Sequence, residues 1–257
     1  MLGGGLGSQP TTECDIFGSY QCLELDGNSD YVALPAGLKS AVNMNAGTIH
    51  VWVDIRSNDG ASGQNIIRFA DDDTNNNITL QYHKTNTEFR ATYRLGGTYK
   101  EATYNEASFD HDDYMDQGWI HLATTWESDG AGTGEVKIYA NGALKETVAQ
   151  TSNWGSDVID VAVIGSNDNA SGGFTDGFID QLAVYNEVKS SDIISIMYNN
   201  GKPLDLTTIH GENTGRTRYS PSGLIAYYQF EGNVLDSSGN NYHGTLAGTA
   251  GFNTTQP

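Results

Sequence analysis

The sequence is poor in cysteine, in proline and in positive charge. Its 257 residues include two cysteines, five prolines and 13 lysines and arginines, against 32 aspartates and glutamates. The formal net charge of −19 repels a phosphate backbone and an anionic membrane surface, so no nucleic-acid partner is expected. No apolar run approaches the ~18 residues needed to cross a bilayer, so no membrane insertion is expected.

The few cysteines and the first residues bear on where the protein acts. Cys14 and Cys22 either bridge a local hairpin or remain as two thiols, and one pair does not make a disulfide framework. The start, "MLGGGLGSQP", has neither a basic stretch nor an apolar stretch of a secretory signal. The sequence therefore predicts a protein that stays in the cytosol or leaves by another route, such as release of a virus particle.

Motifs of catalysis are also missing. The sequence contains no H-E-x-x-H, no G-x-S-x-G and no phosphate-binding loop. The sequence therefore predicts a protein that is not an enzyme.

What the sequence does contain is a series of short alternating runs between clusters of Gly, Asn and Asp. "TIHVWVDI" places its aliphatic residues on one face, and "ITLQYHK" and "WIHLATTW" alternate in the same way. Asn141-Gly142 predicts a hairpin turn, because both residues tolerate positive φ. Half-buried strands with this spacing predict an all-β fold, a sandwich of two packed antiparallel sheets.

One stretch predicts a short helix. "KSSDIISIMYNNGKP" offers Ser190 or Ser191 as N-cap, Asp192 in the first turn, and Gly201 and Pro203 as stop signals. The predicted organisation is a flexible arm at 1–12, a sandwich at 13–205, a linker at 206–221 and a C-terminal segment at 222–257.

Six blocks in this order resemble laminin-G-like domains of the concanavalin-A-like lectin/glucanase superfamily. The blocks are "LELDGNSDYVALP", "TIHVWVDI", "GWIHLATTW", "VKIYANGAL", "VAVIGSN" and "GFIDQLAVYNEVKSSDIISIMYNNG". The resemblance covers roughly residues 20–201. It implies a jelly-roll sandwich of two curved sheets. The glucanases of this superfamily carry an E-x-D-x-x-E strand, and Glu127-Ser128-Asp129 is followed by Gly132 instead of a second Glu.

The segment "GLIAYYQFEGNVLDSSGNNYHGTLAGTA", residues 223–250, resembles the opening strand and loop of such a domain, although it stands near the end. A sandwich without its first strand exposes sheet edges and part of its core. We therefore expect this segment to complete the sandwich, either in cis or swapped in trans with a second copy. The alternative is a truncated second repeat that packs loosely.

The resemblance also implies a structural calcium ion. Asp180, in "GFIDQLAV", shares parity with Phe178, Leu182 and Val184, which predicts a carboxylate on a core-facing side. In related glucanases a similar aspartate binds calcium, with Asp26 or Asp30 as helpers here. The alternative is that Asp180 accepts hydrogen bonds from the backbone amides of a crossing loop. Two acidic clusters also suit hard cations or are solvated loop tips. They are Asp71–Asp73 and the group Asp110, Asp112, Asp113 and Asp116.

Four aromatic residues stand opposite the apolar stripes of their strands: His50, Trp52, Trp119 and His121. If the two strands lie in one sheet, the four line a concave surface where rings stack on sugars and histidines bond hydroxyl groups. The alternative is that loops or the C-terminal segment cover this face, since a Trp-x-His pair recurs as packing in the family that the sequence resembles.

The expected function is that of a non-enzymatic virion structural protein. The Gly-rich start, lectin-like core and "DSSGN" tail resemble in layout the virion proteins of tailed marine bacteriophages. This role implies a capsid decoration, cement or fibre protein that contacts capsid or tail proteins, forms a homo-oligomer and binds host surface glycans. The alternative is a bacterial surface or secreted carbohydrate-binding lectin or adhesin, located extracellularly.

Overall fold

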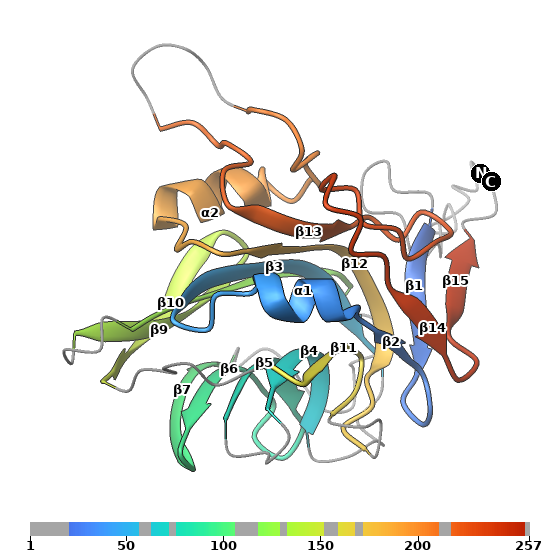
Figure 1. Ribbon diagram of the computed structural model, residues 1–257, viewed down its shortest axis with the longest axis horizontal. Helices are drawn as coiled ribbons and strands as arrows, with labels where there is room; N and C mark the ends of the chain where they lie inside the picture. The colour runs from blue at the N-terminus through green and yellow to red at the C-terminus, as the bar shows by residue number, and fades with distance from the viewer. Residues whose placement is uncertain are drawn as a thin grey trace, which may run out of the picture.

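Two antiparallel sheets pack face to face in a jelly-roll sandwich (Figure 1). The computed structural model describes residues 21–56, 63–71, 76–105, 118–128, 133–151, 159–167, 172–210 and 217–254. The predicted all-β sandwich is confirmed. The helices of this described part are all too short or too polar to traverse a bilayer.

The first sheet, sheet A, has eight strands. Their order is β10-β9-β8-β3-β12-β1-β15, and β13 pairs with β12 beside β1. The bounds are β1 (Gln21–Asp26), β3 (Ala46–Ile55), β8 (Ile120–Glu127), β9 (Gly134–Ala140), β10 (Ala143–Gln150), β12 (Asp176–Tyr185), β13 (Leu224–Tyr228) and β15 (Gly251–Thr254).

The second sheet, sheet B, has seven strands in the order β14-β2-β11-β4-β5-β6-β7. The bounds are β2 (Tyr31–Ala33), β4 (Gly63–Ala70), β5 (Asn77–His83), β6 (Glu88–Leu95), β7 (Thr98–Tyr104), β11 (Val161–Ile164) and β14 (Thr245–Ala247). Consecutive strands β4 to β7 form a meander, so these four neighbouring strands at one end of the sheet come from a single stretch of chain.

The core between the sheets follows the predicted alternation. Ile49, Val51, Val53 and Ile55 of β3 all lie in one buried cluster. The apolar residues of β5 and β8 join the same cluster: Ile78, Leu80, Tyr82, Ile120, Leu122 and Trp126. The hairpin turn is also confirmed, because Asn141 and Gly142, between β9 and β10, have φ of 50° and 75°.

The helix predicted near residue 190 is α2 (Ser191–Tyr198), capped by the Ser190 side chain, which accepts from Ile193 N. It lies on the side of sheet A that faces away from sheet B (Figure 1). A second helix, α1 (Ala36–Ala41), was not expected. It follows Pro35, has no side-chain cap, and buries only Leu38, so its six residues carry no helical periodicity.

The C-terminal segment contributes three strands to the described fold of the same chain. β13 runs beside the second half of β12, from Leu182 to Tyr185, where β1 has already ended. β14 extends sheet B beyond β2, and β15 extends sheet A beyond β1. Asp236 of the "DSSGN" loop accepts hydrogen bonds from the backbone N of Tyr227, Ser238 and Tyr242, which holds the loop against β13.

The stretch predicted as a linker is held at both of its described ends. His210 and Tyr219 exchange backbone hydrogen bonds, and Leu206 and Tyr219 are fully buried. The Tyr219 hydroxyl donates to Leu206 O at 2.6 Å and lies 2.8 Å from the Tyr185 hydroxyl. The chain therefore enters β13 from a fixed position above sheet A.

Candidate functional site

The outer face of sheet B is polar because its strands alternate. On β5, Ile78 and Leu80 point into the core. The alternate residues Asn77, Thr79 and Gln81 point outward. On β6 the residues Thr92 and Arg94 share that outward parity. The cross-strand register sets Arg68 beside Thr79 and Asn77 beside Arg94, so a patch of donors and acceptors forms across three strands.

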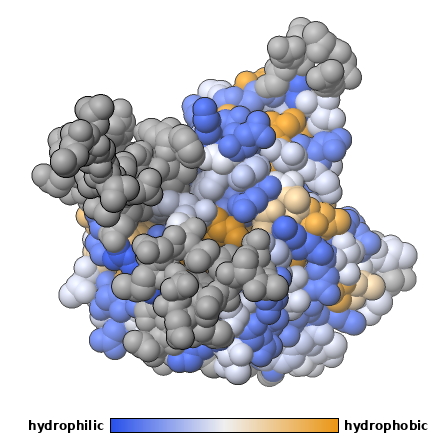
Figure 2. Space-filling view, turned by 180° about the vertical axis from the view of Figure 1, so that it is seen from behind, coloured by the Kyte–Doolittle hydropathy of each residue, from blue (hydrophilic) through white to orange (hydrophobic). Residues whose placement is uncertain are grey.

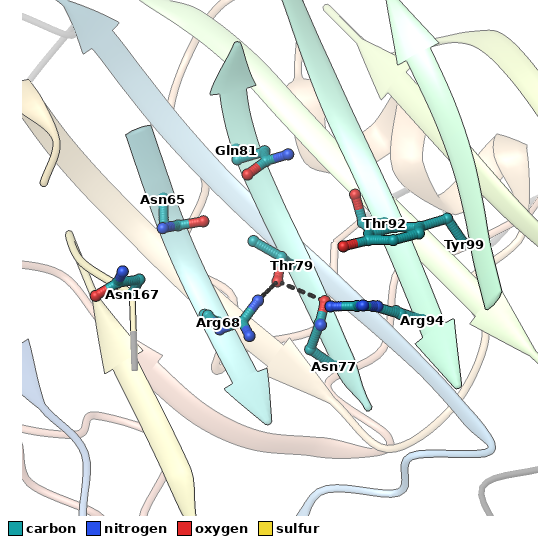
Figure 3. Close-up of a pocket in the computed structure, with 9 residues that line it drawn as sticks. All are labelled: Asn65, Arg68, Asn77, Thr79, Gln81, Thr92, Arg94, Tyr99 and Asn167. Carbon is teal, nitrogen blue, oxygen red and sulfur yellow. Dashed lines mark hydrogen bonds between the residues drawn. The ribbon is translucent and has the colours of Figure 1, made fainter. Parts of the chain in front are cut away.

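This patch is hollowed into a pocket of about 310 Å³ (Figure 3). Its lining consists of amides, hydroxyls, two arginines and one tyrosine, with no carboxylate among the described residues. The lining residues are Asn65, Arg68, Asn77, Thr79, Gln81, Thr92, Arg94, Tyr99 and Asn167. The volume lies at the lower end of the range for small-molecule sites, about 300–1,000 Å³.

The floor of the pocket is rigid. Asn77 is 3% exposed and Thr79 is 2% exposed. The Thr79 hydroxyl donates to Asn77 Oδ1 at 3.1 Å and accepts from Arg68 Nη1 at 3.0 Å. Figure 3 shows this chain of contacts from β4 to β5. Because the arginine is fixed by a neighbour, its guanidinium is preorganised for a ligand.

Arg94 and Tyr99 form the opposite wall. The Arg94 guanidinium lies over the Tyr99 ring, 4.2 Å from its centroid, and the ring is 52% exposed. Arg90, four residues before Arg94, lies outside the pocket and pairs with Glu88 at 2.6 Å and Glu101 at 3.7 Å. The sheet face thus carries one arginine held by carboxylates and two that line the cavity.

A glycine sets the third wall. Asn65 Nδ2 donates to Gly173 O at 3.4 Å, and Thr175 Oγ1 donates to Asn65 O at 2.8 Å. Gly173 has φ of +59°, and a Cβ there would come within 2.3 Å of Asn65 Nδ2. Only glycine fits this close approach, so the loop after β11 can hold the amide in place.

On the face shown in Figure 2, hydrophobic residues lie in small patches between hydrophilic ones. Tyr99, at the pocket, is among the most exposed large hydrophobic side chains of the described chain. An exposed aromatic beside hydroxyl and amide groups is the surface chemistry that suits a sugar ring.

Three of the four aromatic residues predicted to line a glycan groove, His50, Trp52 and His121, lie on the neighbouring strands β3 and β8, but the predicted groove is wrong. His50, Trp52 and His121 are at most 3% exposed. His121 Nε2 lies 2.8 Å from His50 Nδ1, and the Tyr198 ring of α2 stacks on Trp52 at 5.9 Å. α2 covers this face, so the predicted alternative, packing, holds for these three residues.

The covering also fixes the ionisation of the histidines. Burial lowers the pKa of His50 to about 3. Burial and the neighbouring His50 lower the pKa of His121 well below its usual value. Because one ring nitrogen must accept the hydrogen bond from the other, at least one ring is neutral, and the lowered pKa values keep both rings neutral near pH 7.

Trp119, the fourth residue, lies apart from the other three. It is partly buried and packs against Phe178 and Cys22, with its ring 6.2 Å from that of Phe178. Arg56 covers the same Phe178 ring at 3.6 Å. Cys22 is fully buried and disulfide-bonded; Cys14, the other cysteine of the chain, lies outside the described residues.

Asp180 does not face the core between the sheets, so that prediction is wrong. A bulge between Asp180 and Ala183 interrupts the pairing of β12 with β3, and Gln181 has φ of 51°. Leu182 therefore points into the core, whereas Asp180 pairs with Trp52 on the covered outer face. It is fully buried and accepts from the backbone N of Gln181, its neighbour in the same strand, at 2.9 Å. The predicted alternative, hydrogen bonds from the backbone of a crossing loop, stays a prediction.

Asp26 and Asp30 hold the turn between β1 and β2. Asp26 Oδ1 accepts from the backbone N of Asn28, Ser29 and Asp30 at 2.9–3.2 Å. Asp30 accepts from Asp26 N and from both the backbone N and the hydroxyl of Thr249. Three donors already aim at Asp26 Oδ1, and such donors would repel a cation.

These three aspartates do not form a common calcium site. The register places Asp26 opposite Asp176, four residues before Asp180 and thus roughly 13 Å away along the strand. Within the described residues, no three His, Cys, Asp or Glu side chains are grouped to hold a metal ion. Asp71 is described and accepts from Asn76 Nδ2. The rest of the acidic clusters lies at 72–73 and 110–116, outside the described residues, so calcium there stays a prediction.

Sequence reasoning missed the pocket on sheet B. The signal was present in "ITLQYHK" and the Asn77 before it. The alternate apolar residues of this stretch indicated the core, whereas the polar residues between them, Asn77, Thr79 and Gln81, were not interpreted as a site. Polar residues on the solvent face of a strand are ordinary, so this alternation alone marks no site. The pocket forms because the meander places Arg68 and Arg94 on the strands on either side of β5, an arrangement that the alternation within one strand does not predict.

Two curved antiparallel sheets with a polar outer face define the class of lectin-like jelly-roll domains. The family model for the concanavalin A-like lectin/glucanases superfamily matches residues 26–195. The chain belongs to this superfamily. No curated protein matches it.

Solved structures share the fold at low identity. A carbohydrate-binding candidate from Bacteroides ovatus ATCC 8483 has a TM-score of 0.58 at 14% identity, covering 93% of this chain; the chain spans 60% of that protein. Ruminococcus gnavus IT-sialidase CBM40 has a TM-score of 0.54 at 15% identity, covering 69% of this chain and 97% of its own. A heptameric SAP-like pentraxin from Limulus polyphemus has a TM-score of 0.51 at 16% identity, covering 80% of this chain and 94% of its own. At these identities the similarity shows the fold alone.

Proposed function

We propose that the protein is a glycan-binding module whose site is the pocket on the outer face of sheet B. The observation that carries the proposal is the lining of this pocket. Buried and fixed hydroxyl and amide groups surround an exposed aromatic ring, Tyr99, on a sheet of a lectin superfamily fold.

The chemistry of the lining matches that of a sugar. Asn65, Asn77 and Gln81 each supply an amide with donors and an acceptor, and Thr79 and Thr92 supply hydroxyls. A pyranose presents hydroxyls around its rim and C–H groups on its face. The rim suits the amide floor, and the C–H face suits the Tyr99 ring.

The comparisons support the same class of ligand. The Ruminococcus gnavus IT-sialidase CBM40 was also solved bound to α2,3-sialyllactose, with a TM-score of 0.52 at 16% identity. The receptor binding domain of a botulinum neurotoxin C/D mosaic serotype shares the fold with a TM-score of 0.53. Sugar binding is thus a use to which proteins of this fold are put.

Binding without hydrolysis is part of the proposal. Glycosidases place two carboxylates on either side of the scissile bond, about 5–10 Å apart. The described lining of the pocket contains amides, hydroxyls and arginines and no carboxylate. We therefore expect binding of glycans without release of reducing ends.

A role on a virus particle is the second candidate function. The layout of the chain and the acidic surface favour it, since a charge of −19 keeps a protein soluble at the ionic strength of seawater. Mass spectrometry of purified particles tests this role. High copy number supports a decoration or cement protein of the capsid, a few copies support a fibre or tail protein, and absence favours the lectin or adhesin outside a particle.

The binding function is tested with the full chain on a glycan array, followed by calorimetry on each hit. Tyr99→Ala should weaken binding about ten-fold, because stacking contacts of this kind contribute about 1–3 kcal/mol. Leu144→Ala is the matched control, since Leu144 is 45% exposed on β10 of the other sheet and should bind as the wild type does. Absence of any hit, or hits that Tyr99→Ala leaves unchanged, would contradict the proposed site.

A further inference from the structure

We propose that the outer edge of β15 binds the same edge of a second copy of this chain, with the two strands paired antiparallel about a two-fold axis. The eight-stranded sheet A of one copy then continues into sheet A of the other. The basis is a contrast between the end strands of the two sheets. At one end of the sandwich they carry charges that protect the edge, and at the other end they do not.

The protected end strands are β7 and β10. β7 contains Lys100 and Glu101. β10 contains Lys145 and Glu146, next to a shift in its register with β9. Charged side chains and irregular pairing keep an edge from adding a further strand. The Thr103 hydroxyl of β7 also donates to Glu146 at 3.0 Å, so these two edges are joined to each other.

The opposite end strands, β14 and β15, lack this protection. Charged residues make up 18% of the chain, yet no Asp, Glu, Lys or Arg follows Asp236 in the sequence. β14 and β15 both come after that point, and they lie together at one end of the sandwich (Figure 1). Within the described part of the chain, β15 pairs with β1 alone and β14 pairs with β2 alone. A neutral edge of this kind is a template for another strand.

The unprotected edge is held in a fixed position. In the turn between β14 and β15, Gly248 has φ of +75°, and a Cβ there would come within 2.5 Å of Ser29 O. Thr249 donates its backbone N–H and its hydroxyl to Asp30 Oδ1 at 2.6 and 3.1 Å. Phe252 of β15 packs against the core between the sheets. Because the edge is already ordered, pairing with a further strand costs little conformational entropy.

The charge of the chain favours a second copy as the partner. A partner with net positive charge is attracted to acidic surface, whereas a neutral strip suits a partner with the same negative charge. Two copies, each with a formal charge of −19, repel each other wherever carboxylates meet. The edge of β15, with the sequence GFNT, brings two copies together without any charged residue of its own.

The same argument selects the antiparallel arrangement. The register of β1 with β15 sets Glu24 beside Gly251 and Gln21 beside Thr254, so one end of the edge is acidic and the other is neutral. Antiparallel pairing places the acidic end of each copy next to the neutral end of the other. Parallel pairing would bring both Glu24 side chains together. A two-fold axis also makes the contact close on itself, because the same strand serves as both halves of the interface.

The pocket on sheet B stays open in this dimer. Its lining lies on β4 to β7 and beside β11, toward the end of sheet B opposite β14. The dimer therefore presents two pockets. Two linked sites raise the apparent affinity for a glycan-coated surface by about 10²–10⁴-fold over one site. This consequence rests on the proposed function, whereas the dimer itself does not.

The test is sedimentation of the full chain over a range of concentrations. Four paired residues form a small interface, so we expect a reversible dimer with a dissociation constant on the order of 10–100 μM. Raising the salt concentration from about 50 mM to about 500 mM should tighten the dimer roughly three-fold or more, because salt screens the repulsion between two acidic copies.

Variants then locate the interface. Asn253 follows the core-packed Phe252 and points to the outer face of sheet A, near its counterpart in the second copy. Asn253→Lys and Asn253→Glu should each weaken the dimer about five-fold or more, because like charges meet across the axis. An equimolar mixture of the two variants should restore it. Thr147→Lys, on an exposed position of β10 at the opposite edge of the same sheet, is the matched control and should dimerise as the wild type does. A thermal melt of each variant checks that the fold is intact.

Each contrary outcome overturns the proposed dimer. A chain that stays monomeric at about 1 mM and high salt would mean that another segment or another partner occupies this edge. A dimer that separates only after unfolding would indicate exchange of the C-terminal segment instead of edge pairing. A dimer that both Asn253 variants leave unchanged, or that Thr147→Lys weakens equally, would place the contact elsewhere. None of these results depends on glycan binding, so they leave the proposed function to its own test.

Discussion

The outer faces of the two sheets differ, because later elements of the chain cover the face of sheet A, whereas the face of sheet B carries an open pocket. On sheet A, α2 and the chain after it cover the strands, and a second apolar cluster forms there. Ile194 and Met197 of α2 lie in this cluster with Tyr227 of β13. On sheet B the meander from β4 to β7 keeps a polar outer face with a pocket. A strand's outward residues become a site only where no later element packs over them.

The covering elements come from the end of the chain. The covering elements all come later in the sequence than the strands that they cover. They are α2, the described ends of the stretch 206–221, and β13. Histidine and tryptophan on the outward parity of β3 and β8 look like ligand-binding residues locally. They are core residues because a segment more than 60 positions away closes over them.

The largest effect is expected from removing the C-terminal segment. Deletion of 223–257 removes β13, β14 and β15 and uncovers β12, β2 and β1 along one edge each. Tyr227, Tyr228 and Phe230 also leave their clusters. We expect loss of cooperative folding and aggregation, measured by thermal melting and gel filtration, because exposed edges pair with other chains. A truncated protein that stays monomeric and equally heat-stable would show that the segment is dispensable.

The same segment can be tested for exchange between copies. A dimer that forms on concentration and separates into monomers only after unfolding would indicate a swapped segment. A monomer at all concentrations supports completion within one chain.

The next largest effect concerns acid stability of the covered face. His50 and His121 have pKa values lowered by burial, to about 3 for His50. The unfolded state binds protons more readily than the folded state, because its histidines have a pKa of about 6.5. The contribution of the neutral pair to stability is therefore complete above pH ~6.5 and is lost as pH falls toward the folded pKa values. The free energy of unfolding should drop by up to about 4 kcal/mol between pH 7.5 and pH 5, by chemical denaturation.

Most carboxylates titrate below this pH window, but Asp54, whose pKa burial raises to about 7, titrates within it and changes stability in the opposite direction. The measurement is therefore made in the Asp54→Asn background, where it reports the histidines. The variant His121→Gln should flatten the slope by about half, even though it lowers stability at neutral pH. An unfolding free energy that stays constant from pH 7.5 to pH 5 would mean that the pair is open to solvent.

A direct comparison of the faces uses one substitution on each. Ile194→Ala leaves a cavity under α2, where Ile194 is fully buried, and should cost about 3 kcal/mol of unfolding free energy. Gln81→Ala on the open face should change stability by less than about 0.5 kcal/mol while weakening glycan binding. Similar stability losses for both variants would remove the distinction between a covered and an open face.

The smallest effect is expected at Asp54, on the outward parity of β3. Desolvation raises the pKa of Asp54 to about 7. The folded state therefore holds a proton that the unfolded state releases, so stability is greatest below pH ~4 and falls as pH rises through 7. Asp54→Asn should raise the free energy of unfolding at pH 8 by about 1–2 kcal/mol, after allowance for the partial solvent access of this side chain, as measured by chemical denaturation. This gain in unfolding free energy should shrink toward pH 4. An equal gain at pH 4 and pH 8 would contradict the raised pKa of Asp54 as its cause.

Much of the architecture was readable from local pattern. The period of two in "TIHVWVDI" correctly predicted that Val51 and Val53 lie in the core. Asn141-Gly142 correctly predicted the hairpin turn between β9 and β10. Ser190 marked the start of α2. α1 was not readable, because six residues with one buried side chain carry no period. The parity of Asp180 failed at a bulge, since one extra residue inverts the faces of everything beyond it.

The sequence by itself determined the fold class, the two-layer core and the chemical character of each strand face, because these follow from alternation and turn residues that act over a few positions. Tertiary structure alone decided which outward face stays open and which residues meet across strands. Burial of His50 and its partner His121 depends on α2, and the placement of Arg68 and Arg94 on either side of β5 depends on sheet order. Both are long-range contacts, which no local period encodes.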